Sequence, residues 1–213
     1  MQPSFALFFV TAVAYLLGSL SFAVIVSRLM GLSDPRSYGS GNPGATNVLR
    51  SGNKAAAALT LLLDAFKGWL AVFVVARWGA AWQLGPDALA LAGLAAFIGH
   101  LYPVFFKFKG GKGVATAAGV LLGWAWPVGL LVLGVWILTV AVLRYSSLAA
   151  LVAAVAAAPC YLLGLVTGWW PVYQPVVRAA MVLSALLIWR HRGNIKRLLA
   201  GQEPRVGQKK AAP

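Results

Sequence analysis

Long apolar stretches divide the chain, and basic residues stand at the ends of most of them. The first covers residues 5–27 and stops at Arg28, and the second covers residues 55–76 and stops at Arg77. A helix needs about 20 predominantly apolar residues to cross the hydrocarbon core of a bilayer. Backbone polar groups inside a bilayer must be satisfied within their own segment, so we expect each stretch to be a membrane-spanning helix.

The composition excludes an ordinary soluble domain. Hydrophobic residues make up 61% of the 213 residues and charged residues only 10%, against about 25% charged residues in typical soluble domains. A single cysteine, Cys160, and two histidines, His100 and His191, rule out a disulfide framework and argue against a zinc site. We therefore expect no bound metal and no cofactor.

The distribution of basic residues predicts the topology. Residues 114–143 form either one long helix or two short ones that meet near Trp124 and Pro127. Two helices place fifteen of the 18 basic residues on the cytoplasmic side, whereas one helix places the basic C-terminal tail opposite the first basic loops. We therefore predict an all-α integral membrane protein with seven transmembrane helices, an external N-terminus and a cytoplasmic C-terminus. The expected spans are about 5–27, 55–76, 88–106, 114–124, 127–143, 148–167 and 174–189, followed by a basic cytoplasmic tail over 190–213.

The first cytoplasmic loop has the composition of a phosphate-binding segment. Its glycines permit tight backbone with exposed amide N–H groups, and its serine, threonine and asparagine side chains add neutral donors. The arginine that ends the segment adds a charged fork. A flexible polar linker is the alternative interpretation. The residues expected to contact phosphate are Gly39, Ser40, Gly41, Asn42, Gly44, Thr46, Asn47 and Arg50.

A second cytoplasmic segment, residues 107–116, combines three lysines with three glycines at the start of a predicted helix. Backbone N–H groups, the positive end of the helix and the lysines would converge on an anion. It is not a Walker A loop, because Phe106 stands where that motif needs glycine. The alternative is a positive stop signal that attracts anionic headgroups. The candidate residues are Lys107, Lys109, Gly110, Gly111, Lys112 and Thr116.

Two further cytoplasmic elements carry polar residues. His191 and Asn194 are three residues apart and share a helix face if the last span continues, although a basic amphipathic tail explains this segment equally well. Ser146 and Ser147 lie in the third cytoplasmic loop. The predicted topology brings all of these segments to one membrane surface.

Charged residues also occur inside the second span. Asp64 and Lys67 are three apart and can pair on one helix face, and His100 ends the third span. A charge in mid-membrane costs at least about 2.5–3.5 kcal/mol on insertion scales. We expect structural or supporting roles for these three residues, with a direct role for the ion pair left open.

Three motifs resemble those of a known family. Residues 39–50, 99–116 and 190–197 resemble the signatures of the PlsY family of bacterial acyl-phosphate:glycerol-3-phosphate acyltransferases, and residues 63–68 resemble that family's second span. The resemblance implies an inner-membrane enzyme that transfers a fatty acyl group from acyl phosphate to the sn-1 hydroxyl of glycerol 3-phosphate, giving lysophosphatidic acid and phosphate. It implies a multi-pass protein among membrane lipids, with a cytoplasmic active face, no nucleic-acid partner and a functional link to an acyl-phosphate-forming enzyme.

The resemblance also implies roles for particular residues. The expected catalytic residues are Ser40, Arg50, Lys109, His191 and Asn194, and the other candidate residues of the cytoplasmic segments would bind substrate. Either His191 or a substrate phosphate takes the hydroxyl proton, and we favour the phosphate because the chain has only four acidic residues. Acyl-CoA-dependent acyltransferases often carry a histidine and an aspartate separated by four residues, but here the corresponding positions are Phe105 and Lys196. A transporter of phosphorylated metabolites is the alternative function, and too few acids exist for a metal-dependent alcohol phosphotransferase.

Overall fold

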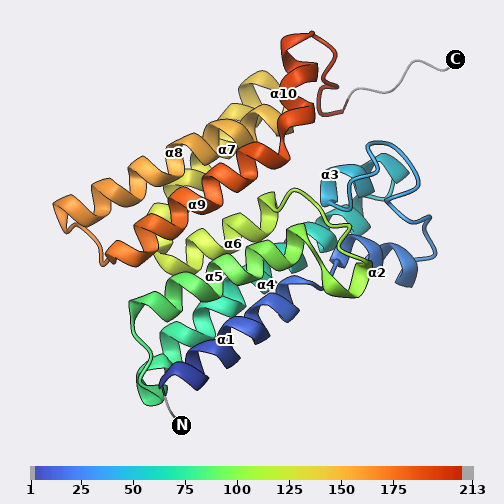
Figure 1. Cartoon of the computed structure of the whole chain (residues 1–213). Helices are drawn as coiled ribbons and strands as arrows, with labels where there is room; N and C mark the ends of the chain where they lie inside the picture. The colour runs from blue at the N-terminus through green and yellow to red at the C-terminus, as the bar shows by residue number, and fades with distance from the viewer. Residues whose placement is uncertain (1–2, 208–213) are drawn as a thin grey trace, which may run out of the picture.

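The computed structural model describes residues 3–207 as a bundle of helices with short connections (Figure 1). Within that part of the chain there is no strand, so the predicted all-α class is confirmed. The elements are α1 (Pro3–Gly18), α2 (Phe22–Leu29), α3 (Ala45–Val48), η1 (Leu49–Ser51), α4 (Lys54–Trp78), η2 (Gly79–Trp82), α5 (Pro86–Leu101), η3 (Val104–Phe106), α6 (Val114–Trp124), α7 (Trp126–Leu143), α8 (Ser146–Thr167), α9 (Gln174–Arg190) and α10 (Arg192–Leu199).

Local sequence explains where the long helices begin and end. The Asn53 side chain accepts a hydrogen bond from the Ala56 N–H at 2.9 Å and caps the start of α4. Pro86 occupies the first position of α5, where its missing N–H costs nothing. Gly168 ends α8 with a φ of 66°, a conformation that glycine adopts without strain.

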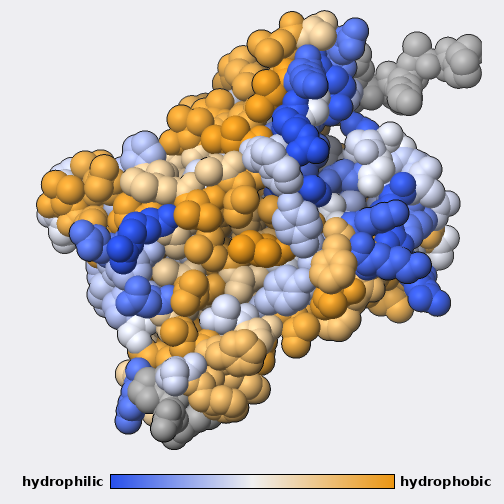
Figure 2. All heavy atoms as spheres, viewed as in Figure 1, coloured by the Kyte–Doolittle hydropathy of each residue, from blue (hydrophilic) through white to orange (hydrophobic). Residues whose placement is uncertain are grey.

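The bundle exposes an apolar belt, as expected for a membrane protein. Leu62, Leu138 and Val166 are largely exposed, and hydrophobic side chains cover the middle of the molecule in Figure 2. Water would disfavour such a surface, whereas lipid tails would not. The chain is therefore a multi-pass membrane protein.

Small residues allow the inner helices to approach closely. Helix α4 packs along α6, and α1 packs along α5. A Cβ atom added to Gly119 of α6 would collide with the backbone of Ala65 in α4, and one added to Gly68 would collide with the backbone of Thr116. The packing thus depends on missing side chains, as is usual where no hydrophobic effect drives helices together.

The predicted first span, 5–27, is not one continuous helix. The chain bends by 44° between α1 and α2. The break occurs at Ser19 to Ser21, where the carbonyl of Leu20 accepts a hydrogen bond from Lys67 Nζ at 2.6 Å. The buried lysine thereby satisfies a backbone group that an unbroken helix would satisfy itself.

Four helices of the described residues are long and apolar enough to cross a membrane, and the bent pair α1–α2 would add a fifth. Helix α6 has 11 residues and α9 has 17. At 1.5 Å per residue α6 is only about 16 Å long. Helices α4, α5 and α7 pack against it and shield it from lipid. The count of seven crossings and the direction of the termini remain predictions, and the last residues of the predicted tail, 208–213, lie outside the described residues.

Candidate functional site

The polar connections predicted to be cytoplasmic meet at one end of the bundle. The α2–α4 loop, the α5–α6 loop, the α7–α8 turn and α10 lie at the end opposite the N-terminus (Figure 1). Hydrophilic residues gather there over α10 and over the region of α2 and α3 (Figure 2). Segments far apart in the sequence therefore share one surface, whatever their orientation in a membrane.

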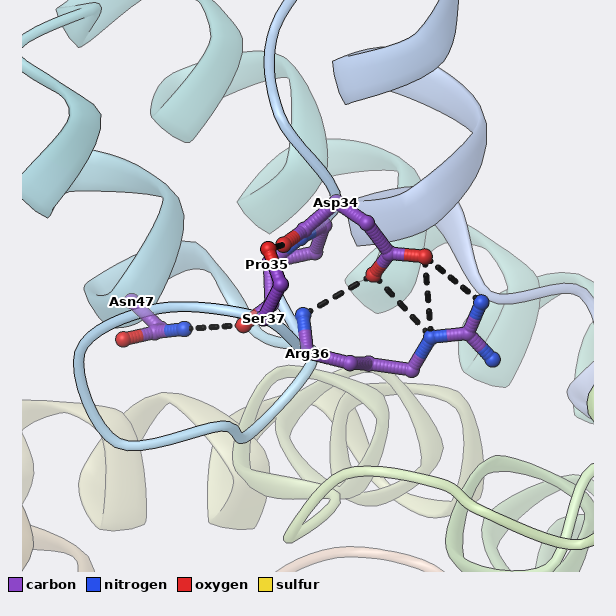
Figure 3. A network of polar contacts seen from close by, with 5 residues as sticks. All are labelled: Asp34, Pro35, Arg36, Ser37 and Asn47. Carbon is purple, nitrogen blue, oxygen red and sulfur yellow. Dashed lines mark hydrogen bonds and ion pairs between the residues drawn. The ribbon is translucent and has the colours of Figure 1, made fainter.

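The first loop is shaped by an ion pair and a buried amide (Figure 3). The Arg36 guanidinium binds both oxygens of Asp34, with the shortest contact at 2.6 Å. Asn47 Nδ2 donates to the carbonyl of Pro35 at 2.6 Å, and Asn47 Oδ1 accepts from the N–H of Ser40 at 3.0 Å. The Asn47 side chain is buried and bonded to the loop's own backbone. This favours a loop-shaping role for Asn47 over the substrate contact predicted from the sequence.

The tight turn at Gly39 is required by its neighbours. Its φ is 61°, and an added Cβ would collide with Asn47 Oδ1 and crowd the Arg50 side chain. Thr46 and Arg50 are exposed beyond this turn, as is Ser40, and Gly41 and Asn42 lie on the same loop. Gly44 stands directly before α3, where extended backbone starts the helix. The first motif therefore presents its donors on the shared surface.

The second loop is held by Arg190, the last residue of α9. Its guanidinium donates to the carbonyl of Gly110 at 3.1 Å and to that of Gly111 at 2.9 and 3.2 Å. It also lies over the Tyr102 ring, 5.6 Å from the ring centroid. An added Cβ at Gly111 would collide with the His100 ring and the carbonyl of Pro43, so this glycine lets the two loops touch. Arg190 thus fixes the backbone that leads to Lys112.

A pocket of about 510 Å³ opens between the two loops. Its cationic side chains come from Lys107, Lys109 and Arg36, the last of which is already paired with Asp34. Lys107 and Phe108 both have left-handed backbone, with φ of 56° and 58°. Non-glycine residues rarely adopt this conformation, and it often marks functional sites. The lining residues are Arg36, Gly41, Pro43, Phe105, Phe106, Lys107, Lys109 and Gly110.

Lys112, two residues after Gly110 on the same loop, belongs to a hydrogen-bonded cluster. Lys112 Nζ donates to Asn194 Oδ1 at 2.6 Å, and Asn194 Nδ2 donates to Glu203 Oε1 at 2.6 Å. Ser147 Oγ donates to the same Glu203 oxygen at 2.6 Å. Ser146 begins α8 next to Ser147 and is partly exposed. Residues from four segments thus form one connected network, which we call the Lys112 cluster (Lys112, Ser147, Asn194 and Glu203).

The surroundings of this cluster bring the pKa of its lysine down toward neutral pH. Burial lowers the pKa of Lys112 to about 8. The guanidinium groups of Arg197, Arg50 and Arg190 also lower this pKa. The Glu203 carboxylate opposes them. The cluster is therefore a concentration of positive charge with one carboxylate inside it.

His191 lies at the junction of α9 and α10 and is 2% exposed. Burial lowers the pKa of His191 to about 4, so the ring is neutral near pH 7. Its Nδ1 donates to the carbonyl of Leu187 at 2.8 Å, which leaves Nε2 with a free lone pair. The ring can accept a proton or a hydrogen bond, although a pKa this low makes it a weak base.

Four residues singled out from the sequence, Asp64, Lys67, His100 and Thr116, are buried among the helices and do not lie on the shared surface. Asp64, Lys67 and His100 form a buried group in which Lys67 Nζ lies 2.8 Å from Asp64 Oδ1 and 3.1 Å from His100 Nδ1. This group ties α4, α5 and the α1–α2 break together, as a structural role requires. Thr116 is fully buried in α6 against Gly68, so the structure favours packing over the predicted substrate contact.

Sequence reasoning missed Arg190, Arg197 and Glu203 as members of the site. Arg190 and Arg197 stand in the third motif, but nothing in the sequence separates them from the other basic residues of the tail. Glu203 could have been singled out from the sequence, because it is the only acidic residue in the basic tail over 190–213.

Comparisons with known proteins give consistent results. A family model described as glycerol-3-phosphate acyltransferase matches residues 8–201. The glycerol-3-phosphate acyltransferase of Paraburkholderia phytofirmans is 59% identical over 203 residues, which cover 95% of this chain and 92% of that protein. The one from Burkholderia pseudomallei is 60% identical over 202 residues, which cover 94% and 95%.

Two crystal structures are also similar. Both are of PlsY (YgiH), an integral membrane glycerol 3-phosphate acyltransferase, at 40% identity, covering 95% of this chain and 96% of that one. The glycerol 3-phosphate form gives a TM-score of 0.84 and the lysophosphatidic acid form gives 0.82.

Proposed function

Because this chain belongs to the glycerol-3-phosphate acyltransferase family, we propose that it transfers a fatty acyl group from acyl phosphate to the sn-1 hydroxyl of glycerol 3-phosphate. The products are lysophosphatidic acid and inorganic phosphate. The hydroxyl oxygen forms a bond to the acyl carbonyl carbon, the bond from that carbon to the phosphate oxygen breaks, and the hydroxyl proton passes to a phosphate oxygen. An acyl-phosphate-forming enzyme must supply the donor.

One observation carries this proposal. Lys112, Asn194 and Ser147, which come from three distant motifs, lie in a single hydrogen-bonded cluster. The positive charges of three arginines, Arg50, Arg190 and Arg197, lower the pKa of Lys112. Such a concentration of cations suits substrates that bring two phosphate groups, because each hydrogen bond to a charged group contributes about 1.5–3 kcal/mol. The pocket lined by Lys107 and Lys109 is formed in part by the α5–α6 loop that also carries Lys112, and it would offer room for the second substrate.

The catalytic roles follow from this arrangement. Arg50 and Lys109 would hold phosphate. The N–H of Ser40, which donates to Asn47, would help to shape the loop around that phosphate. Asn194 would stabilise the oxyanion that develops on the acyl carbonyl through the second hydrogen of its amide N–H₂, since the first is bonded to Glu203. Since the pKa of His191 is lowered to about 4, a substrate phosphate is the better proton acceptor and His191 would orient the hydroxyl. Orientation of the two reactants supplies much of the remaining rate.

The topology belongs to the same proposal. Seven crossings with an external N-terminus place the Lys112 cluster and both loops on the cytoplasmic side of a bacterial inner membrane. Fifteen of the 18 basic residues then face the cytoplasm. The site lies at one end of the bundle, whereas alternating-access transport usually uses a site near the midplane. This placement favours the enzyme over a transporter of phosphorylated metabolites.

The direct test uses the purified protein in detergent with acyl phosphate and glycerol 3-phosphate. We expect lysophosphatidic acid and phosphate to appear in equal amounts, with a chelator present and without coenzyme A. K112A should lose most of this activity. The control is R77A, which also removes one cation but at the C-terminal end of α4, away from the candidate site, and it should retain the activity. Product formation only from acyl-CoA, or equal activity in the two variants, would contradict the proposal.

A further inference from the structure

The segment after α10 folds back over the site. The N–H of Gln202 donates to the carbonyl of Arg197 at 2.7 Å, and the N–H of Val206 donates to the carbonyl of Arg144 at 2.7 Å. Arg144 also donates to the carbonyl of Val206 at 3.1 Å. The tail is therefore pinned to α10 at one end and to the α7–α8 turn at the other, and Glu203 lies between these two anchors.

Glu203 is bonded to three residues on two helices, α8 and α10. Its Oε1 accepts from Ser147 of α8 and from Asn194 of α10, both at 2.6 Å. Its Oε2 accepts from Arg197 Nε at 2.7 Å. The Glu203 side chain is only 7% exposed. A carboxylate removed from water in this way is retained only because its partners compensate for the lost hydration.

The other three acids of the chain serve elsewhere. Asp34 is paired with Arg36, and Asp64 is paired with Lys67 inside the bundle. Asp87 begins α5 at the opposite end of that helix from the α5–α6 loop. Glu203 is thus the one carboxylate that faces the cations around Lys112, within the described residues.

Glu203 determines which way the Asn194 amide points. In the observed orientation the amide N–H₂ faces the carboxylate and the carbonyl oxygen faces the Lys112 ammonium. The flipped amide would place oxygen against oxygen and nitrogen against ammonium, and both contacts would be repulsive. The same carboxylate accepts a hydrogen bond from the Ser147 hydroxyl, which has only one hydrogen to donate. The hydroxyl oxygen of Ser147 is then left to accept a hydrogen bond.

We propose that Glu203 is a positioning residue of the acyl-transfer site, which fixes the Asn194 amide and the Ser147 hydroxyl and, through Asn194, the Lys112 side chain. The assignment deepens the proposed function and rests on it for its kinetic part. Glu203 does not touch the reacting atoms. It holds in place the groups that do, and its negative charge offsets the mutual repulsion of the surrounding cations.

Two substitutions separate geometry from charge. E203Q keeps an oxygen that can accept from Asn194 and Ser147 but removes the charge, whereas E203A removes both. We expect kcat/KM to fall roughly tenfold in E203Q, the loss of about one charge-assisted hydrogen bond, and further in E203A. D87N is the matched control, since it removes one negative charge far from the site, and it should leave kcat/KM within about twofold.

A readout that does not depend on acyl transfer completes the test. The rate at which Lys112 reacts with an amine-directed reagent, followed by mass spectrometry across pH 6–10, reports its pKa. Lys112 is faced by Arg50, Arg190, Arg197, Glu203 and His191. Removing the Glu203 charge should therefore move its titration to lower pH in E203Q and leave it in place in D87N.

The outcomes are distinguishable. A shifted Lys112 titration in E203Q, with thermal stability in detergent close to that of the parent, supports the assignment. An unshifted titration together with unchanged kinetics would overturn it. Faster acyl transfer after truncation at Ala200 would also overturn it, because the tail would then be an obstruction. If the parent protein transferred no acyl group but the titration shifted, the proposed function would fail and the placement of Glu203 would stand.

Discussion

Arg190 offers the sharpest test of how the glycine loop is held. Its planar guanidinium reaches the carbonyls of Gly110 and Gly111 through three contacts between 2.9 and 3.2 Å. R190K keeps the positive charge beside Lys112, but a single ammonium cannot reproduce the fork. The substitution therefore isolates the geometry of the loop from the electrostatics of the site.

The expected magnitude follows from the contacts. Lysine can replace about one of the three, so two hydrogen bonds from a charged donor are lost, each of about 1.5–3 kcal/mol when well shielded. Arg190 is only partly buried, and water compensates for part of the loss. About 2 kcal/mol remains, which is roughly a thirtyfold loss if it is expressed in the transition state.

The assay is kcat/KM for glycerol 3-phosphate at saturating acyl phosphate, with phosphate release as the readout. R192K is the control, because Arg192 is exposed and lies over the Trp189 ring, 4.7 Å from its centroid, without contact to the glycine loop. We expect R192K to stay within about twofold of the parent. An R190K variant that matched R192K would refute the inference that this fork positions the loop that carries Lys112.

Four further predictions concern the same protein. The pKa of Lys112 is about 8, so its ammonium is present below that pH and lost above it. We therefore expect KM for glycerol 3-phosphate to rise as the pH passes through about 8, and a KM that stays constant from pH 7 to 9.5 would contradict this. His191 is neutral across that range because its pKa is about 4, so H191A should lower kcat without moving the profile, and a shifted profile with intact substrate binding would make His191 the base. G119A should lower the melting temperature in detergent, because overpacking against Ala65 costs about 1–3 kcal/mol; an unchanged temperature would exclude a tight α4–α6 contact. Removal of divalent cations with a chelator should leave the rate unchanged, and restoration by added magnesium would contradict this.

Apolar length predicted the helices well, but it could not locate a break inside an apolar segment. Residues 5–27 are apolar throughout, yet α1 ends at Gly18 and α2 begins at Phe22. The break is stabilised by Lys67, which donates to Leu20 from 47 residues further along the chain. A contact of that range leaves no trace in local hydropathy, so only the three-dimensional structure could show it.

Residue types indicated which segments gather at the candidate site better than they indicated where each side chain points. Lysines, arginines and small polar residues do gather at one end, and Lys112, Asn194 and Ser147 meet there. Asn47 and Thr116 belong to the same motifs, but their side chains are buried in the loop and between helices. Motif membership indicates which segments form a site, whereas the direction of each side chain depends on packing between segments.

The scarcity of acids is informative about mechanism once their positions are known. Two of the four carboxylates are paired with cations outside the Lys112 cluster, and a third lies at the opposite end of α5. Among residues 3–207, Glu203 is therefore the one carboxylate that balances the positive charge around Lys112. Two phosphate groups entering such a site would relieve repulsion among Lys112 and the neighbouring arginines. Substrate binding would then raise the pKa of Lys112 and secure its protonated form at the stage when negative charge develops in the reaction. A protein with an added acid in place of Ser146 would lose part of this advantage, since the site would carry one positive charge fewer before substrate bound. S146D should therefore raise KM for glycerol 3-phosphate far more than S146N does, and equal KM values in the two variants would show that charge balance does not govern binding.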